Sequence, residues 1–464
     1  MKRAKSRSTR CQNTRLIRCR VMEGDIPESL IALLIFEHLG PYSIFGRAAA
    51  FEREMKALRR AMLLALTLLS IGGCKDRSQV DENTPLRFWN GFSGPDGVTM
   101  EAIVESYNEK NPNSKFDMQI IPWNTYYDKV TLGMAFGGAP DVFIMQVSRL
   151  PQYADAGALE PIGEMFQKSG LKAEDFVETP YKSGFWKEVQ YGLPLDCWPL
   201  TLYYNKKMFR EAGIEKPPTN LQEFLDAAQK LTKRDANGKV TQWGFALAEV
   251  HNNLVAFMDQ HGGNIIDEAG KRSTLNSPES LAAVRQVQSF IGKIAPEPQG
   301  ANAWDNFKTG RAAMVMQGIY MIADLQGQKG LEFGAAPVPQ FGPKKATWGG
   351  SHMLCIPKGL SPSRKEKAWN FIKYLSDNSL RWAGAGQCPV RVSVLNSPEF
   401  RKLEGQYQAS RQLSYVQYEP QSPVIGQVAG FADAAWEAVL MNKEDPKTVF
   451  ETASRRIDAL LERR

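Results

Sequence analysis

The segment from residue 86 to residue 147 alternates between short apolar runs and amphipathic stretches, and this alternation constrains the fold most strongly. The apolar runs that predict strands are LRFWN (86–90), FDMQIIPW (116–123) and DVFIMQV (141–147). The two stretches between them have helical spacing. The second is expected to run from a cap at Asn124 to Phe136, where Gly137 ends it. Strands that alternate with helices predict a parallel sheet and an α/β fold.

The second half of the chain repeats this pattern. Further strands are predicted at TLYYN (201–205), AAMVMQG (312–318) and FGAAPVP (333–339), and further helices at about 365–375 and from about residue 430. Thr219 and Gln222 can form a capping box at the start of one helix, and Ser277 precedes Pro278 at the start of another. The chain from residue 75 onward is long for a single core and suits about two domains.

A second feature predicts export. The stretch LLALTLLSIGGCKD (63–76) follows the basic segment MKALRR (55–60) and is too short to cross a membrane. Its ending resembles a bacterial lipobox, so residues 55–74 are predicted to be a lipoprotein signal peptide with Cys74 as the lipidated residue. Residues 1–54 are then an extension ahead of a start at Met55, and residues 75–84 are a polar tether. A buried core helix is the alternative, but the polar residues that follow favour a linker.

The charge distribution agrees with this division. Residues 1–60 hold 13 of the 57 Lys and Arg and 6 of the 50 Asp and Glu, so they carry a net charge of +7 and the rest of the chain is formally neutral. No basic face for nucleic acid is therefore expected on the folded part. Three cysteines follow Cys74, without CxxC spacing. A Cys355–Cys388 disulfide and buried free thiols, including Cys197, are both open alternatives.

The common catalytic and cofactor motifs are absent. The sequence has no HExxH, Walker loop, GxGxxG or GxSxG, and its four histidines are not paired at metal-ligand spacing. No cofactor or metal is expected. Two carboxylates could still serve a glycosidase, with Asp141, Asp196 and Asp305 as candidates, but Asp141 is better explained as a cap or brace of its strand.

Tryptophans stand out instead, because many of the ten lie beside Gly, Asn or Pro in predicted loops. These are Trp89, Trp123, Trp198, Trp243, Trp304 and Trp348. Aromatic faces stack on the C–H patch of a sugar ring, and polar side chains bond its hydroxyls. Ligands of α/β sheets bind beyond the carboxyl ends of the strands, where several of these residues are expected. Core packing is the alternative for each tryptophan alone.

Several longer stretches resemble one family. They are FWNGFSGPDG, FGGAPDVFIM, YADAGALEPI, YGLPLDCWPLTLYYNKKMFREAGIEKPPTNLQEF, HGGNIIDEAGK, FKTGRAAMVMQGIY and WGGSHMLCIPKG. The chain from 85 to 464 is similar to the family 1 extracellular solute-binding proteins of ABC sugar importers, the group of maltose-binding protein. The resemblance implies a type II periplasmic-binding-protein fold. One lobe would hold 85–196 and 332–388, the other 197–331 and 389–464, with a multi-crossover hinge between them.

The resemblance also implies partners and a site. A monomer anchored outside the cytoplasm would bind a sugar between its lobes, close, and dock on a membrane permease without catalysis. The cleft positions implied are Trp89, Asn90, Ser93, Trp123, Gln146, Arg149, Asp196, Trp198, Glu249, Asn252, Tyr320, Trp348, Gly349, Gly350, Ser351 and Arg391. Arg149 is equally explained as a surface charge. His352 is expected behind Ser351.

Other ligands remain open. Glycerol phosphate would require several basic residues in the cleft loops, where only Arg149 and Arg391 are expected. A polyamine would require carboxylates beside the aromatic rings, where Asp196 and Glu249 are expected. A glycoside hydrolase would require two carboxylates facing each other across the cleft.

Overall fold

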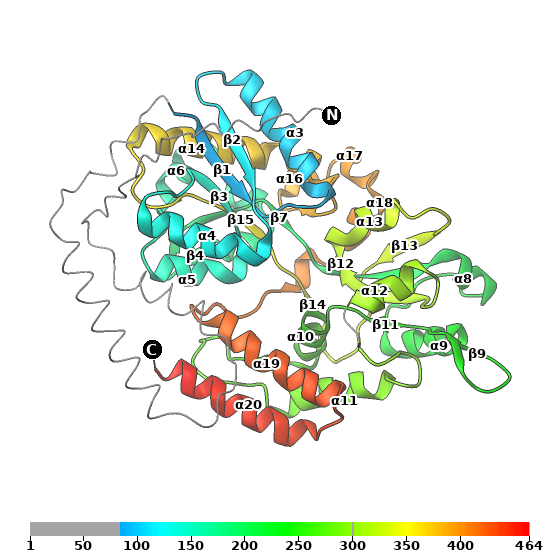
Figure 1. Cartoon of the computed structure of the whole chain (residues 1–464). Coiled ribbons are helices and arrows are strands. Elements are labelled where there is room, and N and C mark those ends of the chain that lie inside the picture. The colour runs from blue at the N-terminus through cyan, green and yellow to red at the C-terminus, as the bar shows by residue number, and fades with distance from the viewer. Residues whose placement is uncertain (1–83, 299–300, 464) are drawn as a thin grey trace, which may run out of the picture.

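The computed structural model describes residues 84–298 and 301–463. These residues form two large β-sheets, one in the upper part of Figure 1 and one in its lower right part. The predicted signal peptide, Cys74 and all of the tether except Thr84 lie outside the described residues. None of the helices within the described ranges combines the length and hydrophobicity that a membrane crossing needs.

The first sheet has five strands in the order β2-β1-β3-β15-β6. Their bounds are β1 (Leu86–Asn90), β2 (Phe116–Ile120), β3 (Val142–Gln146), β6 (Gly192–Pro194) and β15 (His352–Cys355). β1 pairs in parallel with β2 and β3, which confirms the predicted parallel arrangement. β15 runs antiparallel to β3 and β6, so a segment distant in sequence completes this sheet.

Two helices make the crossovers between the parallel strands. α3 (Pro95–Lys110) begins at a proline, whose missing N–H would be unpaired in a first turn anyway. α4 (Trp123–Phe136) ends at Gly137, whose φ of 84° confirms the predicted terminator. The predicted cap at Asn124 is wrong. α4 already begins at Trp123, because Pro122 supplies the extended backbone in front of the helix without a side-chain cap.

Further elements complete this half of the molecule. They are α5 (Leu150–Asp155), α6 (Gly163–Lys168), η3 (Ala173–Asp175), α7 (Glu178–Lys182), the hairpin β4 (Phe185–Trp186) and β5 (Val189–Gln190), α14 (Pro362–Asp377) and α15 (Ser379–Ala383).

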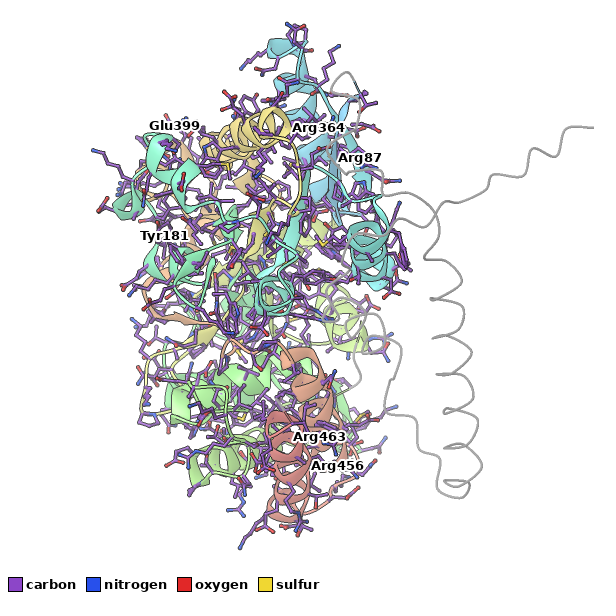
Figure 2. All side chains as sticks on the ribbon, turned by 90° about the vertical axis from the view of Figure 1, so that its left-hand side faces the viewer. Arg87, Tyr181, Arg364, Glu399, Arg456 and Arg463 are labelled. Carbon is purple, nitrogen blue, oxygen red and sulfur yellow. The ribbon has the colours of Figure 1, made fainter. Side chains whose placement is uncertain are left out.

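α14 confirms the helix predicted at about 365–375 and carries one member of a buried ion pair. Asp141 accepts hydrogen bonds from Arg364 Nε at 2.8 Å, Arg364 Nη2 at 2.7 Å and Arg87 N at 2.7 Å. Figure 2 labels both arginines. Asp141 therefore braces its strand, as predicted.

The second sheet has four strands in the order β11-β12-β8-β13. Their bounds are β8 (Leu200–Asn205), β11 (Ala246–Leu247), β12 (Met314–Gly318) and β13 (Phe333–Ala336). β8 runs antiparallel to β12 and β13, and β11 runs parallel to β12. The elements around this sheet are α8 (Lys206–Glu211), α9 (Leu221–Leu231), the hairpin β9 (Lys233–Arg234) and β10 (Val240–Gln242), α10 (Val250–His261), α11 (Pro278–Phe290), α12 (Ala301–Lys308), α13 (Ile322–Gln326), α18 (Glu404–Ser410), α19 (Ile425–Leu440) and α20 (Pro446–Leu461).

Two helix starts in this half test the predicted caps. α11 starts at Pro278 as predicted, and Ser277 caps it by accepting from Ser280 N at 3.1 Å. The capping box predicted for Thr219 and Gln222 is wrong, because α9 begins one residue later. Asn220 is the cap, and Glu223 rather than Gln222 reaches back to accept from Thr219 N at 2.8 Å.

Paired crossover segments connect the two halves. β7 (Asp196–Cys197) pairs with β16 (Cys388–Pro389), and β14 (Thr347–Trp348) pairs with β17 (Val416–Gln417). The boundary predicted at residue 332 disagrees with the strand pairing, because β13 lies in the second sheet and the chain rejoins the first sheet only at β15. The sequence FGAA of β13 is short and apolar. Its local pattern does not indicate which of the two sheets it joins. The other predicted boundaries stay predictions.

The three cysteines of the described chain are free and fully buried. Cys355 lies in β15, within the first sheet, whereas Cys388 lies in β16 between the halves. Cys355 and Cys388 are therefore not joined by a disulfide, and the alternative of buried free thiols is the one that the structure shows. Burial raises the pKa of all three thiols, so they are neutral core residues.

Candidate ligand-binding cleft

A cleft of about 770 Å³ lies between the two halves. Its walls come from the loops after β1, β3 and β12, at the carboxyl ends of strands, and from the crossover segments. β1 and β3 are parallel, so their following loops share one edge of the first sheet, and the loop after β12 reaches the cleft from the second sheet. The lining includes Phe92, Ser93, Asp96, Trp123, Gln146, Ser183, Trp198, His251, Asn252, Tyr320, Asp324, Trp348, Gly349, Gly350, His352, Gln387, Tyr418, Glu419 and Gln421.

Aromatic rings form a continuous row along this cleft. Consecutive ring centroids are 5.9 Å apart for Trp123 and His352, 5.7 Å for His352 and Trp198, and 5.2 Å for Trp198 and Trp348, while Tyr320 lies 5.9 Å from Trp198. The rings are mostly buried, so their positions are fixed by packing. A row of this kind offers apolar faces and ring edges to a ligand that spans both halves.

Glycines let three of these rings approach the backbone. A Cβ built at Gly91, Gly318 or Gly350 would lie 2.3, 2.1 or 2.2 Å from the ring of Trp123, Tyr320 or Trp198. Any larger residue would force the ring to move. The glycines beside these aromatic residues therefore position the rings. The general tendency of glycine to occur in loops does not predict this structural role.

Glu249 holds Tyr320 from behind. The hydroxyl of Tyr320 donates to the Glu249 carboxylate at 2.6 Å, and Asn252 Nδ2 donates to the same carboxylate at 2.5 Å. Glu249 is the N-cap residue of α10 and has a φ of 42°, which is strained for a residue with a Cβ. Burial raises the pKa of Glu249, although these hydrogen bonds act against the shift. The strained backbone thus aims a carboxylate at the tyrosine hydroxyl.

Asp196 holds His352 in a similar way. Its carboxylate is fully buried and accepts from His352 N at 2.9 Å, His352 Nδ1 at 2.8 Å and Trp382 Nε1 at 2.7 Å. With Nδ1 engaged, Nε2 is the ring nitrogen of His352 that remains for a ligand. Asp196 is therefore a positioning residue at the crossover and does not itself line the cleft.

The charged groups of the cleft wall are predominantly acidic. Among the described residues that line the cleft, the ionisable ones are Asp96, Asp324, Glu419, His251, His352 and two tyrosines, with no lysine or arginine. Asp324 is 3.1 Å from Lys308 Nζ. Asp96 accepts from Gly94 N at 3.1 Å and Gly97 N at 2.9 Å, so it occupies the N-terminus of α3. Burial raises the pKa of Asp96.

His251 joins α10 to the C-terminal segment. Its Nδ1 is 2.7 Å from Asp433 on α19, and its Nε2 contacts Glu419. Burial opposes the charged imidazolium, but the hydrogen bonds with Asp433 and Glu419 outweigh it and raise the pKa of His251 to about 10. At neutral pH this cluster has one positive and two negative charges. It fixes the loop that carries Tyr418, Glu419 and Gln421.

The structure brings many of the predicted site residues to the cleft. Those that line it are Ser93, Trp123, Gln146, Trp198, Asn252, Tyr320, Trp348, Gly349 and Gly350. Glu249, Asp196 and Ser351 lie one layer behind. The Ser351 hydroxyl donates to the backbone carbonyl of Asp196, so Ser351 secures the crossover rather than facing a ligand.

The other predicted positions point elsewhere. Trp89 packs into the core against α4 with Lys129 Nζ 4.9 Å from its ring, and the Asn90 side chain accepts from Phe92 N at 3.1 Å inside its own loop. Arg149 lies 5.0 Å from the Tyr127 ring, outside the lining.

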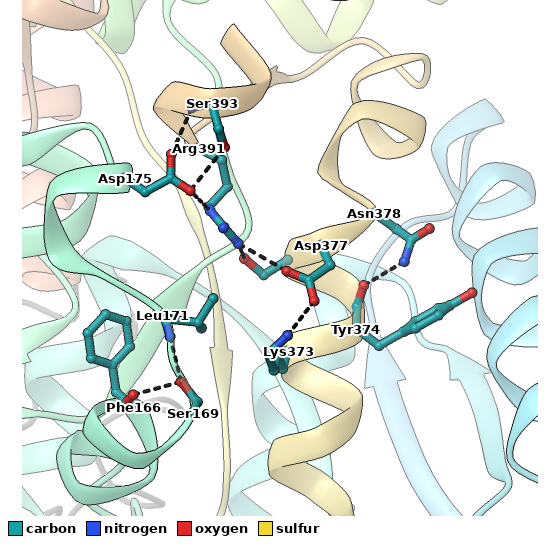
Figure 3. A network of polar contacts seen from close by, with 11 residues as sticks. Phe166, Ser169, Leu171, Asp175, Lys373, Tyr374, Asp377, Asn378, Arg391 and Ser393 are labelled. Atoms are coloured by element: carbon teal, nitrogen blue, oxygen red, sulfur yellow. Dashed lines mark hydrogen bonds and ion pairs between the residues drawn. The ribbon is translucent and has the colours of Figure 1, made fainter. Parts of the chain in front are cut away.

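Arg391 contacts residues in the half of the molecule that contains α14, and it does not line the cleft. It binds Asp175 at 2.6 Å and Asp377 at 3.2 Å, and Ser393 also donates to Asp175, as Figure 3 shows. The expectation that Arg391 faces the cleft at the last crossover is therefore corrected. Its two carboxylate partners hold it against η3 and the end of α14.

Sequence reasoning missed several lining residues. Asp96 belongs to the recognised loop GFSGPDG, so its carboxylate could have been singled out. His251 lies between Glu249 and Asn252, which were both predicted. Tyr418, Glu419 and Gln421 carry no local signal, because they reach the cleft only through the pairing of β17 with β14.

Contacts also join the two walls directly. Gln421 Nε2, next to α19, donates to the backbone carbonyl of Ser183 at 3.1 Å. The Arg149 guanidinium lies so close to Gly426 on α19 that a Cβ there would be 3.3 Å from Nη1. Ser183 and Arg149 belong to the half that contains the first sheet. The two halves therefore also contact each other outside the paired crossover strands.

Two α/β halves, paired crossover segments and a cleft lined from both sides define a two-lobed binding protein. Residues 92–380 match the family described as bacterial extracellular solute-binding protein, and the chain belongs to that family. The members of this family bind substrates and are not enzymes.

Individual relatives are distant. The chain is 24% identical to the maltotriose-binding protein of Pyrococcus abyssi, with 77% of each chain covered. It is 22% identical to the sn-glycerol-3-phosphate-binding periplasmic protein of Escherichia coli K12, with 82% of this chain and 93% of that protein covered. An ABC substrate-binding protein from Listeria monocytogenes in complex with cycloalternan has a TM-score of 0.71 at 22% identity, and covers 82% of this chain and 99% of its own. The similarity to the Listeria structure shows that the two proteins share a fold.

Proposed function

We propose that this protein captures a sugar, an oligosaccharide or glycoside, in the cleft between its lobes and delivers it to the permease of an ABC importer. The observation that carries the proposal is the row of rings from Trp123 to Trp348 and Tyr320, flanked by polar side chains. Rings stack on the C–H faces of pyranoses, and Gln146, Asn252 and the His352 imidazole can bond hydroxyls. One relative is a maltotriose-binding protein, and one similar structure is a substrate-binding protein in complex with cycloalternan. Both of these ligands are carbohydrates.

A phosphorylated solute fits this cleft less well. Phosphate recognition uses Arg or Lys, or the N–H groups of a helix N-terminus. Among the described lining residues there is no arginine or lysine, and Asp96 already fills the N-terminus of α3. The distant relative that binds glycerol phosphate therefore does not decide the ligand class of this chain.

The proposal includes the cellular setting. The family is extracytoplasmic, and the sequence resemblance to a lipobox supports export and a lipid anchor on Cys74 of a monomeric protein. No catalysis is proposed. Of the lining carboxylates, Asp324 is engaged by Lys308 and the Trp304 indole, and Glu419 by His251. Asp96, the third lining carboxylate, accepts two backbone N–H groups at the N-terminus of α3.

A thermal-shift screen of the purified protein tests the proposal. The panel contains maltotriose and other neutral oligosaccharides, with glycerol phosphate and spermidine as controls. A ligand at about 100 times its Kd should add roughly 2.7 kcal/mol of stability, a shift of a few degrees. The sugar should be recovered unchanged. Stabilisation by glycerol phosphate alone would contradict the proposal, and a cleaved sugar would contradict the absence of catalysis.

A further inference from the structure

The cleft wall contains hydrogen-bond acceptors to which none of the described residues donates. Asp96 receives both of its backbone hydrogen bonds on Oδ1, which leaves Oδ2 for a ligand. Glu419 meets His251 through Oε1, which leaves Oε2. Gln387, only 1% exposed, has an Oε1 without a hydrogen-bond partner. Gln387 Oε1 is buried, and buried acceptors are normally paired, whereas Asp96 and Glu419 are partly exposed in the cleft. Together the three oxygens favour a ligand rich in donors.

The net charge of the surroundings points the same way. His251 offsets only one of its two carboxylate partners, Glu419 and Asp433. Within the described part of the chain, Asp96 has no cationic partner within hydrogen-bond range. Lys308 neutralises Asp324 alone among the lining carboxylates. A cleft with low-dielectric walls focuses such a field and concentrates counter-ions. The hydroxyls of a neutral sugar can donate to these carboxylates, but only a cation also neutralises their charge.

We propose that the sugar captured in this cleft carries a protonated amino group, which Asp96 and Glu419 recognise together with Gln387. An ammonium has three donors and no acceptor, so it can donate to acceptors of this kind in the cleft wall. The indole faces of Trp123 and Trp198 attract a cation as well as a sugar ring. This inference rests on the proposed function, because it adds an amino group to the proposed sugar.

Matched sugars separate the inference from the proposed function. Calorimetry compares glucosamine, galactosamine and the β-1,4-linked glucosamine disaccharide with their hydroxyl and N-acetyl counterparts. The inference expects at least one amine form to bind about tenfold tighter than both counterparts, the gain of one charge-assisted hydrogen bond. Amine forms that bind equally, more weakly or not at all overturn it. Binding of neutral counterparts in that case leaves the proposed function standing.

Two variants and one control complete the experiment. Asp96→Asn keeps an oxygen for Gly94 N and Gly97 N, and should reduce the preference for the amine form about tenfold. Asp117→Asn, on the exposed side of β2, should leave the preference unchanged. A preference that survives Asp96→Asn overturns the role of Asp96. Stabilisation by spermidine without any amino sugar overturns both the inference and the sugar assignment.

Discussion

At the scale of single residues, the cleft depends on small residues that support large ones. Trp198 can lie against the backbone only because Gly350 has no side chain. The family resemblance implied Tyr320, and the sequence pattern identified Trp198 and Trp348 as candidate site residues, because aromatic residues at strand ends suggest ligand binding. It could not identify Glu249 as a support for Tyr320. That role depends on a strained backbone angle and on a contact between residues 71 positions apart.

Substitution of Gly350 tests the support of the rings. In Gly350→Ala the new Cβ would meet Trp198 Cη2 at 2.2 Å, so the ring must move. We expect a loss of about 1–3 kcal/mol in unfolding free energy, the usual cost of overpacking, and weaker sugar binding. Urea denaturation and calorimetry measure the two effects. Gly430→Ala is the matched control. Nothing lies within 4 Å of its Cβ, and alanine favours the α19 helix by up to about 1 kcal/mol. Equal behaviour of the two variants would contradict the steric argument.

At the scale of elements, much of the first sheet was predictable. The alternation of strands and helices before residue 147 predicted three parallel strands, and Gly137 marked the end of α4 correctly. The placement of β13 and β15 was not predictable from local pattern. β15 joins the first sheet from more than 200 residues away, and FGAA fits either sheet. Long-range pairing is decided by tertiary packing, which local spacing does not encode.

The buried Asp141–Arg364 pair fastens α14 to the first sheet. In Arg364→Met the Asp141 carboxylate, almost completely buried, would lose both guanidinium hydrogen bonds. We expect a loss of about 3–5 kcal/mol in unfolding free energy, because an unpaired buried charge remains. Lys365→Met is the control on the adjacent residue. Its partner Glu160 is less deeply buried, so about 1 kcal/mol or less is expected. Urea denaturation compares the two, and similar losses would contradict this role of Asp141.

The His251 cluster predicts a pH dependence of the contact between α10 and α19. The folded pKa of about 10 exceeds the ordinary value of 6.5, so the folded state holds its proton more tightly. The resulting stabilisation is fully present below about pH 6.5 and is lost as pH rises toward 10. Unfolding free energy measured from pH 7 to 10 should therefore fall more steeply in the native protein than in His251→Gln. His261→Gln, on the same helix but hydrogen-bonded to a backbone carbonyl, should keep the native slope. Parallel slopes for all three proteins would contradict the charged state of His251.

At the scale of the whole molecule, the contacts that bridge the cleft link binding to shape. Gln421 and Gly426, from the lobe that contains the second sheet, meet Ser183 and Arg149 from the other lobe. None of these contacts was predictable, because each depends on the relative position of the lobes. A bound solute can shift the population toward a closed shape only by contacts that exist in that shape alone. Direct contacts between the lobes act in the same direction and so contribute to affinity.

Removal of the Gln421 amide tests this link. Gln421→Ala loses the hydrogen bond to the Ser183 carbonyl, which is worth about 0.5–1.5 kcal/mol. We expect sugar affinity to fall by roughly two- to tenfold. Small-angle scattering without ligand should show a larger mean radius of gyration than in the native protein, because the open shape becomes more populated. Saturating sugar should restore the native value. Gln427→Ala, on the first turn of α19 and outside the cleft lining, is the control and should change neither quantity. If Gln421→Ala weakened binding without changing the ligand-free radius, Gln421 would act on the ligand directly and the contact with Ser183 would have no part in closure.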